Sequence, residues 1–220
     1  WQAVGIAPIR KTHSGMVPVS GEGSYKWEGY LPIKEKPNLY NPEIGYISTA
    51  NQNVTTDDYN KWEAIGFDWA DPYRGERITR VIESKEKFNI KEMLELQVDY
   101  YSIPSEQIIN LSTGLIFNNI EYFSMLEKWD KKLSKSSIEA GIYIEWQNQL
   151  IQEINKKFIP EKVKNYISMQ LFTVIDKISK MNAKDRKELL NQTFNSSIDN
   201  LKEKFAENPD NWVYGQQDFK

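Results

Sequence analysis

Hydrophobic side chains recur about every four residues through much of the chain beyond residue 80. Because about 3.6 residues complete one helical turn, this spacing gathers the apolar positions on one face of a helix. One helix is predicted over 138–158, a second begins after Pro160, and a third covers 190–205. Their apolar faces consist of Ile138, Ile142, Trp146, Leu150, Ile154 and Phe158, then Val163, Ile167, Leu171, Val174 and Ile178, then Leu190, Phe194, Ile198, Leu201 and Phe205. We expect these faces to form a core. A further helix is predicted to start at Asn89, which Glu92 follows in the spacing of a capping box.

The first 80 residues follow a different pattern. They hold 8 of the 11 glycines and 6 of the 9 prolines, which is typical of short strands joined by turns. Residues 3–9 form a predicted strand, and Pro8 places it at a sheet edge or at its own end. Residues 46–50 form a second extended run, which stops at Asn51 and is followed by Gln52 and Asn53. The chain is therefore predicted to contain strands and loops first and helices afterwards.

Composition excludes several classes of protein. With 40% hydrophobic and 27% charged residues, the 220-residue chain suits a globular protein of one large or two small domains. The net charge of −3 and the lack of a basic block argue against nucleic acid as a partner. Cysteine is absent and His13 is the only histidine, so thiolate and histidine-rich zinc sites are excluded. No apolar run reaches the roughly 18 residues that span a membrane.

The start of the sequence is unusual. It opens with Trp1 and shows neither a methionine nor the charged and apolar pattern of a signal peptide. We therefore expect the chain to be a piece of a longer or processed protein.

Taken in order, the motifs of the first hundred residues resemble the penicillin acylase family of N-terminal nucleophile (Ntn) hydrolases. The resemblance is carried by Val4-Gly5-Ile6-Ala7-Pro8-Ile9-Arg10, Val17-Pro18-Val19-Ser20-Gly21, Trp27-Glu28-Gly29-Tyr30-Leu31-Pro32, the run from Asn41-Pro42 to Thr49-Ala50-Asn51, and Trp69-Ala70-Asp71-Pro72-Tyr73-Arg74-Gly75-Glu76-Arg77-Ile78. Sparser matches follow at Trp129-Asp130, Ser137, Ala140 and Trp212-Val213-Tyr214-Gly215. It implies an α+β fold, in which residues 1–84 are a strand and loop segment of a partial αββα core. Residues 85–220 would be a mainly helical region of the large subunit.

The resemblance also implies roles for two residues at an active site. Asn51 matches an asparagine whose side-chain N–H stabilises the oxyanion of the tetrahedral intermediate, a task that suits a neutral amide donor. Arg74 matches an arginine beside the same site, where a fixed charge and five donors can order the asparagine. The residues alone leave other interpretations open: Asn51 as a simple cap of the extended run, and Arg74, like Arg77 and Arg80, as a partner in a surface ion pair.

Glu63 matches an acidic residue that ligates a structural calcium ion in the family, and a carboxylate is a suitable hard ligand. The alternative is a solvated surface glutamate. The resemblance implies no cofactor for catalysis.

In the family, the nucleophile is a serine freed at the start of the large subunit by autoproteolysis, with its α-amine as the base. The resemblance places this chain downstream of that serine, so we expect the chain alone to be inactive. Its implied partners are the small subunit and the N-terminal part of the large subunit of the same precursor, together with an acyl-amide substrate. Penicillins, cephalosporins and N-acyl homoserine lactones are the implied substrates, which connects the family to antibiotic biosynthesis and quorum quenching. The implied location is periplasmic or secreted.

Two other hypotheses remain. The first is a non-catalytic scaffold with the same fold, and the second is a helical module in which residues 85–205 bind a partner. The second hypothesis predicts wide exposed apolar faces, whereas the acylase hypothesis predicts that these faces pack on one another.

Overall fold

A computed structural model of the chain describes residues 1–216. The chain divides into two compact units, one of residues 1–79 and another that begins at Arg80. The last four residues, 217–220, belong to the expected helical region but lie outside the described residues.

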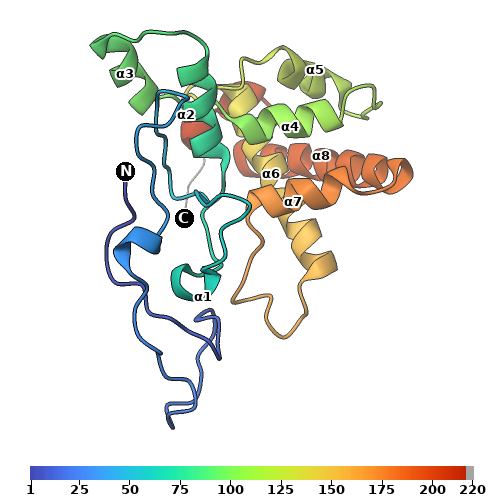
Figure 1. Cartoon of the computed structure of the whole chain (residues 1–220). Helices are drawn as coiled ribbons and strands as arrows, with labels where there is room; N and C mark the ends of the chain where they lie inside the picture. The colour runs from blue at the N-terminus through green and yellow to red at the C-terminus, as the bar shows by residue number, and fades with distance from the viewer. Residues whose placement is uncertain (217–220) are drawn as a thin grey trace. The chain divides into compact units, whose positions relative to one another are not determined.

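The first unit consists mostly of extended segments and turns, as the blue to teal part of Figure 1 shows. Its helical elements are the short 3-10 helix η1 (Ile33–Glu35), the single-turn helix α1 (Trp62–Ile65) and the beginning of α2 (Tyr73–Glu83). A small cluster of buried residues, Ala7, Leu31 and Ala64, lies between these segments, and Ile9 and Ile65 pack against it.

The predicted strands are wrong as regular elements. Within residues 1–216 the extended segments form only isolated bridges, including one between Pro8 and Tyr30, and no ladder of paired strands. Gly5 interrupts the first run because its φ of 84° lies outside the extended region. The second run, 46–50, lies between Gly45 and Asn51, which both have positive φ, and it has no bridged neighbour.

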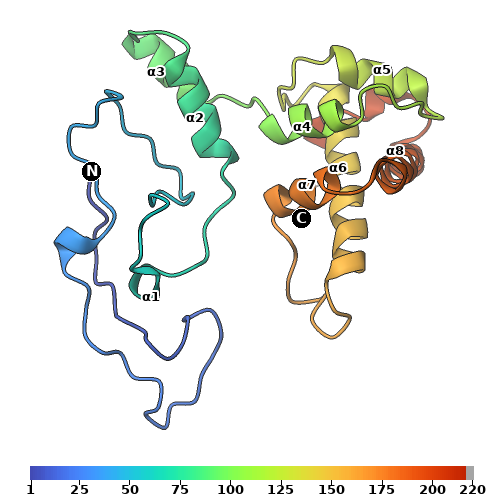
Figure 2. The same ribbon diagram turned by 45° about the vertical axis from the view of Figure 1, so that its right-hand side comes forward.

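The second unit is a set of packed helices. They are α3 (Ile90–Gln97), α4 (Ile103–Leu111), α5 (Ile120–Lys128), α6 (Ile138–Phe158), α7 (Leu171–Ser179) and α8 (Ala183–Phe205), followed by the 3-10 helices η2 (Pro209–Asn211) and η3 (Tyr214–Gln216). The long helix α6 packs against α8 and also contacts α5 and α7, and Figure 2 shows α8 end-on beside α6. No helix among the described residues has the length and hydropathy required to cross a bilayer.

The predicted core faces of α6 and α8 are confirmed. The four central residues of the α6 face and the first four of the α8 face are buried, and the two helices meet where Trp146 Nε1 donates to Thr193 Oγ1 at 3.0 Å. The capping box is also confirmed, because Asn89 Oδ1 accepts from the Glu92 backbone N–H at 3.0 Å and the Glu92 carboxylate accepts from the Asn89 N–H at 2.9 Å. However, α3 contains no buried residue.

The helix predicted to begin after Pro160 is wrong over its first ten residues. Residues 161–166 form turns, and α7 begins only at Leu171. Asn155, near the end of α6, provides the reason, because its side chain accepts from the Met169 N–H at 3.0 Å and donates to Ser168 Oγ at 2.8 Å. Such side-chain bonds compete with helical pairing of the backbone. Val163 and Ile167 are accordingly exposed.

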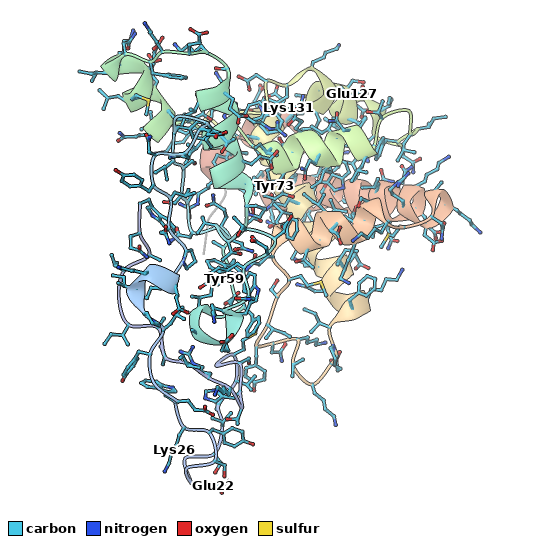
Figure 3. All side chains as sticks on the ribbon, viewed as in Figure 1. Glu22, Lys26, Tyr59, Tyr73, Glu127 and Lys131 are labelled. Carbon is cyan, nitrogen blue, oxygen red and sulfur yellow. The ribbon has the colours of Figure 1, made fainter. Side chains whose placement is uncertain are left out.

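A lysine closes the end of α5. Lys131 lies in the left-handed region, with φ of 64°, and its Nζ donates to the carbonyls of Leu126, Glu127 and Trp129 at 3.0, 3.2 and 2.5 Å. Lys131 and Glu127 are labelled in Figure 3. A cation at a helix C-terminus satisfies carbonyls that have no helical partner. Burial lowers the pKa of Lys131, and nearby carboxylates partly offset this effect.

Candidate active site

Asn51 is presented by a tight turn at the end of the run 46–50. Its φ is 65°, which places it in the left-handed region that asparagine tolerates better than most residues. Its backbone carbonyl accepts a hydrogen bond from the Ala70 N–H at 3.0 Å, so the turn is fixed from a point nineteen residues further along the chain. The turn leaves the residue exposed.

Arg74 lies in the first turn of α2 and holds the Asn51 side chain. One guanidinium nitrogen, Nη2, donates to Asn51 Oδ1 at 2.7 Å and to the Ala50 carbonyl at 3.0 Å. Arginine carries only donors, so the amide oxygen must face it and the amide NH₂ must be at the other end. The Arg74 guanidinium therefore fixes both the position and the orientation of the Asn51 side-chain amide.

The NH₂ group of Asn51 is available to a ligand. No acceptor for Nδ2 lies within residues 1–216, and the side chain is exposed. A hydrogen bond from Nη2 to Oδ1 also polarises the amide, because hydrogen bonds in a chain strengthen one another. The Asn51 NH₂ group is thus a preorganised neutral donor, and the Arg74 guanidinium holds the opposite end of the amide in place.

A second amide, which the sequence analysis did not single out, supports the same turn. Gln52 Oε1 accepts from the Ala50 N–H at 2.6 Å. Its carboxamide lies against Gly75, where the Cβ of any other residue would overlap it. The signal in the sequence was the glycine next to Arg74, since a glycine often marks a position where another group approaches the backbone closely.

The start of α2 is itself well anchored. Asp71 Oδ1 accepts from the Tyr73 N–H at 3.0 Å, and Tyr73, labelled in Figure 3, is buried. Burial raises the pKa of the Tyr73 phenol, and the carboxylates of Asp71 and Glu76 add to the shift. The phenol therefore stays neutral at physiological pH. The fixed helix start gives Arg74 a rigid base.

Glu63 lies elsewhere in the first unit, in α1, and has no hydrogen bond to Asn51 or Arg74. Its backbone carbonyl accepts from the Arg10 N–H at 3.1 Å. No group of three or more histidine, aspartate or glutamate side chains that could hold a metal ion exists in the described part of the chain. Calcium takes six to eight oxygen ligands, so Glu63 can supply one ligand but not a site.

Of the three predicted site residues, the structure thus brings Asn51 and Arg74 together and leaves Glu63 apart. Arg80, on the same helix as Arg74, pairs instead with Glu106 at 2.6 Å.

Comparison with known proteins identifies a family model and relatives that agree with one another. A family model described as penicillin amidase matches residues 1–219. The acyl-homoserine lactone acylase QuiP of Pseudomonas fluorescens strain Pf0-1 is 30% identical over 161 residues, which cover 65% of this chain and 19% of that protein. Penicillin G acylase of Escherichia coli is 37% identical over 82 residues, which cover 37% of this chain and 10% of that protein. The chain therefore spans a fifth or less of the length of these relatives.

Among solved structures, a thermostable penicillin G acylase from Alcaligenes faecalis matches with a TM-score of 0.72. The match covers 94% of this chain and 45% of that chain, at 16% sequence identity. At this identity the similarity shows the fold alone. The predicted resemblance is therefore confirmed at the level of the fold, although the described residues lack the regular strands of the expected αββα core.

Proposed function

The chain belongs to the penicillin amidase family, and from this premise we propose that the complete protein is an acylase that hydrolyses a linear amide bond. Its substrates would be penicillins, cephalosporins or N-acyl homoserine lactones. The observation that carries the proposal is the 2.7 Å hydrogen bond from Arg74 to Asn51 Oδ1, since it turns the amide NH₂ outward as a ready donor. The alternative of Arg74 as a surface ion-pair partner does not account for this geometry.

In the proposed reaction, a serine from another segment of the protein attacks the amide carbonyl, and its own α-amine accepts the proton. The carbonyl oxygen becomes an oxyanion, and Asn51 donates an Nδ2–H to it. Collapse of the intermediate expels the amine, which takes the proton from the α-ammonium group, and leaves an acyl-enzyme ester. Water then hydrolyses the ester through a second oxyanion that the same donor stabilises. The donor acts when charge develops, so it lowers the barrier rather than tightening substrate binding.

The partners proposed for this chain are other segments of the same precursor. Support comes from residues 4–6, where Val4 and Ile6 are 87% and 77% exposed. Their backbone N–H groups have no acceptor within the described residues. Backbone donors without a partner on either side of the bend at Gly5 can pair with a neighbouring strand. We therefore propose that strands from the rest of the protein pair with this segment and complete the αββα core.

Glu63 is proposed as one carboxylate ligand of a structural calcium ion whose other ligands come from the rest of the protein. The ion would stabilise the fold and would take no part in the reaction. A periplasmic or secreted location completes the proposal.

The helical partner-binding hypothesis receives less support. It requires exposed apolar faces on the long helices, but the α6 and α8 faces are buried against each other.

The test is an assay of the complete, self-processed protein with an N-acyl homoserine lactone and with penicillin G. An acylase releases one primary amine for every carboxylic acid that it releases from the acyl group. Opening of the lactone ring produces an acid and an alcohol, and opening of the β-lactam ring produces an acid and a secondary amine. Neither produces a primary amine, so measuring acid and primary amine together identifies the bond that is cut. Processed protein that releases no amine from either substrate class would overturn the proposed function.

A further inference from the structure

Two charged side chains are buried in the described part of the chain, and they differ in their partners. Glu145 accepts hydrogen bonds from Gln149, Asn200 and Lys204, at 3.2, 2.9 and 3.0 Å. Lys36, which is only 4% exposed, has one partner, because its Nζ donates to the Gly5 carbonyl. An ammonium group has three donors, and a buried cation is costly unless it is paired. The Lys36 site therefore lacks a counter-ion.

Lys36 follows η1 and lines an open pocket of about 360 Å³ in the first unit. This volume lies within the range of small-molecule sites. The walls are largely apolar and include Trp1, Val4, Ile6 and Trp69. The pocket can thus hold an apolar group and has a buried cation in its lining.

A second cation, Arg10, lines the same pocket, and no acidic residue does. Arg10 Nη1 makes a single long hydrogen bond, of 3.4 Å, to the Ala64 carbonyl. A guanidinium has five donors in a planar fork that matches a carboxylate. The pocket therefore combines two cations, several unused donors and apolar walls.

We infer that this pocket binds a carboxylate attached to an apolar group, with Lys36 as the main anchor and Arg10 as the second. The carboxylate is either that of a free small acid or that of an aspartate or glutamate in another segment of the complete protein. The inference does not depend on amide hydrolysis, because neither Lys36 nor Arg10 belongs to the Asn51–Arg74 site.

The first experiment measures thermal unfolding of the protein in benzoate, in benzamide and in sodium sulfate. Benzoate carries the anion on a ring, benzamide keeps the ring without the charge, and sulfate supplies charge without the ring. A ligand that binds only the folded state raises Tm, by about 3 °C at ten times its Kd for a chain of this size. We expect this shift with benzoate and less than a third of it with either control.

Three variants test the anchor. Lys36→Met should weaken benzoate binding at least ~10-fold, since one of the two charges is lost, and Lys36→Arg should keep most of the response. Lys34→Met is the matched control, because Lys34 lies two residues away and is exposed. This control should respond like the unchanged protein. The benzoate–benzamide comparison needs no variant, so poor folding of Lys36→Met leaves the test intact.

The second experiment finds the source of the carboxylate in the complete protein. Carbodiimide joins an amine to a carboxylate that touches it, and mass spectrometry identifies the joined peptides. Coupling of Lys36 to an aspartate or glutamate of another segment, with no benzoate shift, supports the internal source. A benzoate shift without coupling supports a free ligand. The inference is overturned if Lys36 is not coupled and benzoate stabilises the protein no more than benzamide or sulfate does.

Discussion

Replacing Arg74 with methionine removes the two hydrogen bonds that hold the Asn51 amide and the Ala50 carbonyl in place. We expect this change to reduce kcat although Arg74 itself does not touch the oxyanion in the proposed mechanism. The χ2 torsion of asparagine is broad, so an unsupported amide samples many orientations. A donor must point at the developing charge before the charge appears if it is to lower the barrier.

The expected loss of kcat can be estimated from the hydrogen bonds that Arg74 donates. A hydrogen bond to a charged group contributes about 1.5–3 kcal/mol, and each 1.36 kcal/mol corresponds to about tenfold in rate. Loss of the support should therefore lower kcat roughly 10- to 150-fold. Loss of the donor itself, in Asn51→Ala, should cost roughly 10²–10³-fold. Because Arg74 acts through Asn51, the kcat of the double variant Arg74→Met/Asn51→Ala should be about the same as that of Asn51→Ala. If the two residues acted independently, their effects would multiply and kcat would fall roughly 10³–10⁵-fold.

The assay is a double-mutant cycle in kcat on an amide substrate, with the complete and self-processed protein. Arg80→Met is the matched control, because it removes an arginine that lies on the same helix and pairs with Glu106 rather than with Asn51. Such pairs contribute little, so its kcat should stay within about twofold of the unchanged protein. Multiplicative losses in the double variant would refute the claim that Arg74 works by holding Asn51.

Three further outcomes are expected. Gly75→Ala should displace the Gln52 side chain and lower kcat, while unfolding free energy changes by less than about 1 kcal/mol, because the gain in helix propensity offsets the lost hydrogen bond. The Lys85 ammonium and a backbone N–H lower the pKa of Glu92 below its ordinary 4.5. The stability from Glu92 is thus present above that value and lost as pH falls through the folded-state pKa, so the Tm difference between Glu92→Gln and the unchanged protein should vanish in acid. Ala206→Gly should raise unfolding free energy by about 1–2 kcal/mol in denaturant titrations, because Ala206 adopts φ 69° and ψ 174°, a region suited to glycine.

The sequence predicted the features that depend on neighbouring residues. Helical periodicity identified the α6 and α8 faces, since each face is built from residues three or four apart. The pairing of Asn89 with Glu92 was visible for the same reason. The end of the extended run at Asn51 was also visible, although its left-handed conformation and exposed amide were not.

The sequence could not predict the features that depend on distant contacts. Regular strands require neighbours, and pattern alone could not tell whether residues 3–9 and 46–50 find them. The choice of Arg74 over Arg77 or Arg80 depends on the path of residues 52–72, which brings the start of α2 back to the turn. The late start of α7 depends on the Asn155 side chain, fourteen residues before Met169. In each case the outcome depends on residues far away in the sequence, which the local pattern does not contain.

The central claim is that Asn51 donates to the oxyanion, and steady-state kinetics of Asn51→Ala in the complete protein test it most directly. Self-processing shows that the variant matures, and its circular dichroism spectrum shows that it folds. Asn51→Asp serves as a matched variant that keeps the shape and the Arg74 contact but has no N–H to donate. Asn53→Ala controls for changes to the turn. For both Asn51 variants the account predicts a kcat lower by roughly 10²–10³-fold with little change in KM. A kcat near that of the unchanged protein, or a raised KM with unchanged kcat, would contradict it.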